Sequence, residues 1–167
     1  MGVKIPIVGT DRSRIKISYR GQYNFEKMYK EAVYWFKTNE YNFNEKTHIE
    51  TIRPIGKEHI INFYGSRDLD DYVRYHINVE IWTLRTAAIK VGDKKLVDGE
   101  IQIRVNGIME LDFKNTFGTT KLGIVLRNFY HKYIIKRRIW TKYSSDVITE
   151  TNSLIRTFKT NLGLINP

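Results

Sequence analysis

The sequence predicts an α+β protein, in which an antiparallel meander of about five strands carries helices on one face. Two patterns predict this class. Apolar and polar residues alternate with period two through the middle of the chain, and apolar residues recur every three or four positions near both ends. Apolar residues make up 41% of the chain and aromatic residues 13%, enough for a packed core. We expect one helix after the first strand and one or two C-terminal helices.

The chain is predicted to begin with an extended arm at residues 1–13, followed by a single α+β domain at 14–167. Pro6 and Gly9 oppose helix formation in the arm. The first strand follows, because apolar residues alternate with polar ones from Arg14 to Arg20. Its outward positions are mostly cationic: Arg14, Lys16, Ser18 and Arg20.

A helix is predicted next, after a turn at Gly21-Gln22. Asn24 is a favoured residue type for an N-cap, and the helix should end near Thr38-Asn39. Spacings of three and four residues place its apolar side chains on one stripe: Phe25, Met28, Tyr29, Ala32, Val33 and Phe36.

Four further strands follow this helix. The clearest is residues 73–81, which alternate over nine positions and continue towards Val91. Gly92-Asp93-Lys94-Lys95 is typical of a hairpin connection, and Gly107 indicates a bulge or bend in the last strand. The four predicted strands are residues 41–52, 58–64, 73–81 and 101–111.

Two helical patterns complete the chain, either as separate helices or as one long kinked helix. Ser144 or Ser145 is expected to cap the second helix, and Gly163 suits its C-terminal end. One apolar face comprises Leu122, Val125, Leu126, Phe129, Tyr133 and Trp140; the other comprises Val147, Thr151, Leu154, Ile155, Phe158 and Leu162.

The most unusual segment is Phe113 to Ser145, which holds eight Lys and Arg residues and no carboxylate in a chain of net charge +10. On a helical wheel, cations lie opposite the apolar arc, which we expect to pack on the sheet. The cationic face would then meet phosphates or an acidic protein, or would simply be solvated. The candidate contact residues are Lys121, Arg127, His131, Lys132, Arg138 and Lys142, with Arg14, Lys16 and Arg20 as an extension.

Nothing in the sequence indicates catalysis. The only carboxylate cluster, Asp68, Asp70 and Asp71, suits a turn better than a site for a hard cation. The four histidines lack ligand spacing, and there are no cysteines. Gly118-Thr119-Thr120-Lys121 lacks the order of a phosphate loop and is read as a helix cap. We therefore expect no enzyme, no cofactor and no metal.

The expected location is the cytoplasm or an assembled particle. No apolar run approaches the roughly 18 residues that a membrane span needs, so no span is expected. The start of the chain is too short and interrupted for a signal peptide.

Several blocks of the sequence together resemble small uncharacterised basic α+β proteins of small-genome archaea and of uncultured viruses. These blocks are Arg20-Gly21-Gln22-Tyr23-Asn24-Phe25, Tyr34-Trp35-Phe36, Arg67-Asp68-Leu69-Asp70-Asp71-Tyr72 and Phe129-Tyr130-His131-Lys132-Tyr133-Ile134-Ile135-Lys136. The resemblance covers roughly residues 14–160. It implies a small genome or a virus as context, and it implies no functional residue.

Two functions fit these observations. The first is a non-enzymatic structural or binding subunit of a larger assembly, such as a virion or tail, with other subunits or copies of itself as partners. The second is an RNA- or ribosome-associated accessory protein that contacts backbone phosphates through residues 120–142.

Overall fold

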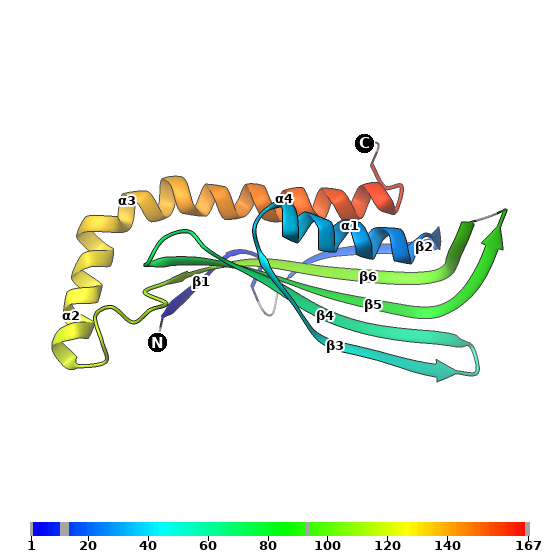
Figure 1. The fold of residues 1–167 in the computed structure, drawn as a ribbon, viewed down its shortest axis with the longest axis horizontal. Helices are drawn as coiled ribbons and strands as arrows, with labels where there is room; N and C mark the ends of the chain where they lie inside the picture. The colour runs from blue at the N-terminus through cyan, green and yellow to red at the C-terminus, as the bar shows by residue number, and fades with distance from the viewer. Residues whose placement is uncertain (1, 11–13, 93, 166–167) are drawn as a thin grey trace.

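The computed structural model describes residues 2–10, 14–92 and 94–165, and it has two layers (Figure 1). One layer is a sheet of six antiparallel strands within the described residues. In the other layer, α1 (Phe25–Thr38) and α4 (Ser144–Asn161) lie across one face of this sheet. The predicted α+β class is therefore confirmed, with a helix inside the strand series and helices at the C-terminal end.

Four strands form a meander in chain order, and the two N-terminal strands lie one after the other along the outer edge of β6. The first of these two strands was not predicted from the sequence. Residues 3–8 of the expected arm form this edge strand, where Pro6 is tolerated; residues 1 and 11–13 of that arm lie outside the described residues. The strands are β1 (Val3–Val8), β2 (Ile15–Tyr23), β3 (Asn42–Arg53), β4 (Gly56–Asp68), β5 (Val73–Val91) and β6 (Lys94–Leu111).

Two glycines show which face of the sheet the helices cover. A Cβ atom at Gly65 would collide with the Phe36 ring of α1, and one at Gly107 would collide with Thr151 of α4. Gly107 was predicted as a bulge or bend, and the register of β1 does shift where Val8 pairs with it, although its pairing with β5 is regular. Its lack of a side chain also lets α4 approach β6 closely. Every second residue of β5, from Val73 to Ile81, is buried on this same face. The opposite face of the sheet, which we call the open face, carries the alternate residues.

The two layers are joined by an aromatic and aliphatic core. Phe36 on α1 meets Phe63 of β4 edge-to-face, with ring centroids 5.9 Å apart. The N-cap of α1 is Asn24, whose side chain accepts a hydrogen bond from the Lys27 amide at 2.8 Å, as the sequence predicted. At its C-terminal end, α4 closes at Gly163 with a φ of 68°, which confirms the predicted stop.

The C-terminal helices form one bent helical run rather than two separate helices. The run passes without a break from α2 (Lys121–Phe129) through η1 (Tyr130–Ile135), α3 (Lys136–Arg138) and η2 (Ile139–Tyr143) into α4. Figure 1 shows α2 pointing away from the axis of α4 at one end of the molecule. Because the run continues through Tyr143, neither Ser144 nor Ser145 caps α4. Two details of the sequence prediction, the Trp140 side chain and Asp93 of the hairpin, lie outside the described part of the chain.

Candidate interaction surface on the projecting helix

The segment Lys121–Ile135, made of α2 and η1, projects beyond the end of the sheet, and we call it the projecting helix (Figure 1). It begins at Thr120, whose hydroxyl accepts a hydrogen bond from the Gly123 amide at 3.1 Å. The sequence predicted a helix cap at this position, and the structure confirms it. The polar cap fixes where the helix starts and so which side chains face the sheet.

One face of the projecting helix is tied to the end of the sheet by polar contacts. The guanidinium of Arg127 lies 3.9 Å from the carboxylate of Asp112, the first residue after β6. Asp112 is fully buried, and the Arg127 side chain is only 16% exposed. One turn later, Tyr72 and His131 are hydrogen-bonded to each other.

Rings fill the space around this polar contact. Tyr130 packs on Tyr72 at 5.2 Å between centroids and on Phe117 at 5.6 Å. Burial lowers the pKa of His131, and the neighbouring charge of Arg127 lowers it further. Burial likewise raises the pKa of Tyr72. A neutral imidazole and a protonated phenol are therefore the partners of this hydrogen bond near neutral pH.

The opposite face of the projecting helix is apolar and exposed to solvent. This reverses the sequence prediction: the wheel separated the two faces correctly, but the apolar face points outward and the face with Arg127 and His131 points inward. A mostly buried arginine is tolerated here because the buried carboxylate of Asp112 lies beside it at the end of β6. The exposed fractions are 69% for Leu122, 63% for Val125, 49% for Leu126, 54% for Phe129 and 64% for Tyr133.

The other candidate cations are spread over two places. Lys121, Lys132, Arg138 and Lys142 are exposed along the bent helical run. The predicted extension is not beside them, because β2 pairs with Val97–Val105, the half of β6 that is farther from α2. Two of its residues are held in ion pairs across the open face: Arg14 with Glu80 at 3.1 Å and Arg20 with Glu100 at 3.7 Å, while Lys16 is exposed.

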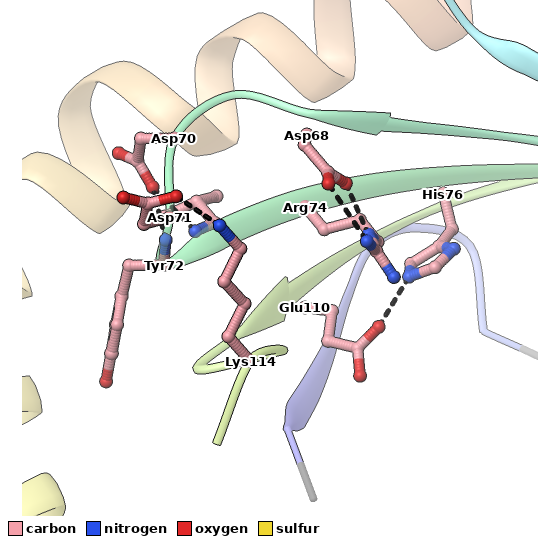
Figure 2. A network of polar contacts seen from close by, with 9 residues as sticks. Asp68, Asp70, Asp71, Tyr72, Arg74, His76, Glu110 and Lys114 are labelled. Carbon is pink, nitrogen blue, oxygen red and sulfur yellow. Dashed lines mark hydrogen bonds and ion pairs between the residues drawn. The ribbon is translucent and has the colours of Figure 1, made fainter. Parts of the chain in front are cut away.

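The aspartate cluster forms a turn, as the sequence indicated (Figure 2). Asp70 accepts hydrogen bonds from the amides of Tyr72 and Val73, at 2.8 Å and 2.7 Å. Asp68 binds Arg74, and Asp71 binds Lys114. Within the described residues, no group of three or more His, Cys, Asp or Glu side chains is arranged to hold a metal ion.

Sequence reasoning missed Asp112 and Tyr72, the two residues that orient the projecting helix. The one available signal is that Asp112 is the last carboxylate before the acid-free stretch. It lies in a loop with a φ of 56°, where no periodic pattern marks it as buried. Its importance depends on a tertiary contact with a residue fifteen positions away.

No known protein family, no curated protein and no solved structure matches this chain. None of the helices in the described residues is long and apolar enough to cross a membrane.

Proposed function

We propose that this protein is a non-enzymatic binding subunit of a larger assembly, such as a virion, a tail or a similar particle. It docks the outer face of the projecting helix into an apolar groove edged by carboxylates on a protein partner. The observation that carries the proposal is the exposed apolar face formed by Leu122, Val125, Leu126, Phe129 and Tyr133. An apolar patch on a rigid surface element is typical of an interface.

The centre of this face has the composition of an interface anchor. The rings of Phe129 and Tyr133 pack together at 4.9 Å between centroids while both stay more than half exposed. Adjacent aromatic side chains that are fixed in place lose little conformational entropy when a partner covers them. The contacts of Arg127 and His131 hold the opposite side of the helix, so the face is preformed.

Charge selects an acidic partner over a second copy of the chain. Lys121 and Lys132 flank the apolar face, and Lys136, Arg137 and Arg138 continue the positive charge beyond the bend. No ion pair with a carboxylate is found for these five cations among the described residues. Two copies packed through this face would bring the same cations together, which repulsion disfavours. A partner rim of Asp and Glu would instead neutralise them.

Nucleic acid is the second candidate, favoured by the absence of any carboxylate from Phe113 to Ser145. The inward orientation of Arg127 and His131 removes two of the six expected contacts on this run. The exposed cations that remain support phosphate contacts with little sequence preference. Such binding would weaken steeply with salt, whereas an apolar interface would not.

The test is sedimentation of tagged protein in a lysate of its source, with and without nuclease. We expect a large complex that survives nuclease and moderate salt. The double variant Val125→Ser with Phe129→Ser should release the protein, and so should Lys132→Glu with Arg138→Glu. Arg127 is left unchanged because its loss would disturb the fold. Ile52→Ser with Ile55→Ser is the matched control, because these residues are 77% and 66% exposed at the far end of the sheet.

Two outcomes contradict the proposal. If both double variants, Val125→Ser with Phe129→Ser and Lys132→Glu with Arg138→Glu, sediment like the wild type, the exposed face is not the docking surface. If nuclease alone releases the protein as a 19.8 kDa species, nucleic-acid binding is the better account.

A further inference from the structure

The open face of the sheet holds a polar hollow that the proposed function does not use. Its volume is about 490 Å³, within the usual range of small-ligand sites. It is lined by residues of β1, β3, β4, β5 and β6 and by Arg14, the residue before β2. The side chains that the argument uses are Lys4, Arg14, Lys46, Asn62, Tyr64 and Asn78.

The carboxylate that lines the hollow, Glu80, is already paired. Glu80 accepts from Arg14 at 3.1 Å and lies 3.6 Å from Arg104. Figure 2 shows the next row of the sheet, where Asp68 binds Arg74 and Glu110 binds His76 at 2.7 Å.

Positive charge is left over after this pairing. Neither Lys4 nor Lys46 has a carboxylate within ion-pair distance among the described residues; Lys46 instead lies 4.6 Å from the centroid of the Tyr64 ring. These two ammonium groups come from strands on opposite sides of the hollow, β1 and β3. Together with Arg14 they place three cations around one carboxylate, that of Glu80. A hollow with this balance favours an anion.

Neutral hydrogen-bonding groups lie between the cations. Asn62 and Asn78 stand on neighbouring strands, and both are half-buried in the open face. No hydrogen bond to either amide side chain is found among the described residues, so each still offers a donor and an acceptor. Such groups suit hydroxyls or the edge of a heterocycle, and the Tyr64 ring beside them adds an aromatic wall.

We infer that this hollow binds a small phosphorylated molecule of nucleotide size, with its phosphate at one of the two lysines, Lys4 or Lys46, and its polar remainder at Asn62 and Asn78. Arg14 contributes by neutralising the Glu80 carboxylate, with which it pairs at 3.1 Å. This inference is independent of docking through the projecting helix, which lies beyond the end of the sheet.

The test is a titration of the purified protein with AMP, followed by the amide resonances of Asn62 and Asn78 at low salt. We expect saturable shifts that Lys4→Ala with Lys46→Ala weakens at least tenfold. The control is Lys37→Ala with Lys90→Ala, which removes the same charge from exposed residues elsewhere and should change binding less than twofold. Adenosine should bind far more weakly than AMP, and inorganic phosphate should bind at the lysines without shifting Asn62.

Several results would overturn the inference. One is an AMP titration without saturation. Another is equal binding by the double lysine variant and the wild type when both give the same folded spectrum. Equal binding of adenosine and AMP would show that the phosphate does not contribute to binding. If oligouridylate binds more tightly than AMP in proportion to its length, the open face is a nucleic-acid surface instead.

Discussion

Arg127 and Asp112 form the contact that orients the projecting helix, with 3.9 Å between guanidinium and carboxylate and the carboxylate fully buried. The Thr116 amide also donates to Asp112 at 2.6 Å, so the carboxylate is held from the loop as well. A buried charge that loses its partner is costly, because water does not reach it. The pair therefore decides which face of the helix is left exposed.

The first prediction is that Arg127→Met destabilises the protein by about 3 kcal/mol, because Asp112 would stay buried without its cation. Urea unfolding at neutral pH measures the loss. Lys132→Met is the matched control on the exposed side, with an expected change within about 0.5 kcal/mol. Equal losses for the two variants would show that Arg127 is not needed to hold the helix.

The sequence was sufficient for the class of fold and for most element boundaries. The Asn24 cap, the alternation over residues 73–81 and the stop at Gly163 are local signals, and each one marks its element correctly. The edge strand β1 was not predictable, because its pairing depends on β6, about a hundred residues away. Local patterns indicate which secondary structure a segment favours, but they do not indicate which strand it pairs with.

The orientation of the projecting helix shows the same limit at the candidate site. The helical wheel of this segment separated the apolar residues from the cationic residues correctly. The usual rule then buries the apolar side, because most amphipathic helices lie on their own core. This helix extends past the sheet, so Leu122 and Phe129 have no core beneath them. The side that does reach the body carries Arg127 because Asp112 neutralises it.

A second prediction concerns acid. Burial lowers the pKa of His131 below its ordinary 6.5, so the unfolded chain takes up protons before the folded one does. The stability contributed by this histidine is complete above about pH 6.5 and is lost as the pH falls through that value towards the lower folded pKa. Stability measured by urea unfolding should thus fall from about pH 7 to about pH 5.

His131→Gln should make this acid-induced loss smaller, because a glutamine side chain does not titrate. His59 and His76 also have lowered pKa values, caused first by burial, so part of the pH dependence should remain in the variant. An identical pH profile for variant and wild type would show that His131 binds no more protons in the unfolded chain than in the folded one.

A third prediction concerns the close approach of α4 to β6. A Cβ atom at Gly107 would collide with the Thr151 hydroxyl and lie 2.9 Å from a Val147 methyl group. Gly107→Ala should therefore cost about 2 kcal/mol through overpacking. Thr151→Ala opens space at that point, so in the double variant the cost of Gly107→Ala should be clearly smaller than in the wild type. Purely additive losses would show that the helix shifts away as a whole.

A fourth prediction uses two neighbouring isoleucines of η1 that face in opposite directions. Ile134 is 60% exposed on the projecting helix, whereas Ile135 is 6% exposed and belongs to the core. Ile134→Ser should change the free energy of unfolding by less than about 0.5 kcal/mol. Ile135→Ser should lower it by about 3 kcal/mol, because it empties a packed site and buries a hydroxyl. Thermal and urea unfolding of both variants measure this contrast. The reverse order would mean that the apolar face of the helix packs on the sheet, as the sequence pattern alone predicted, and it would remove the exposed surface on which docking depends.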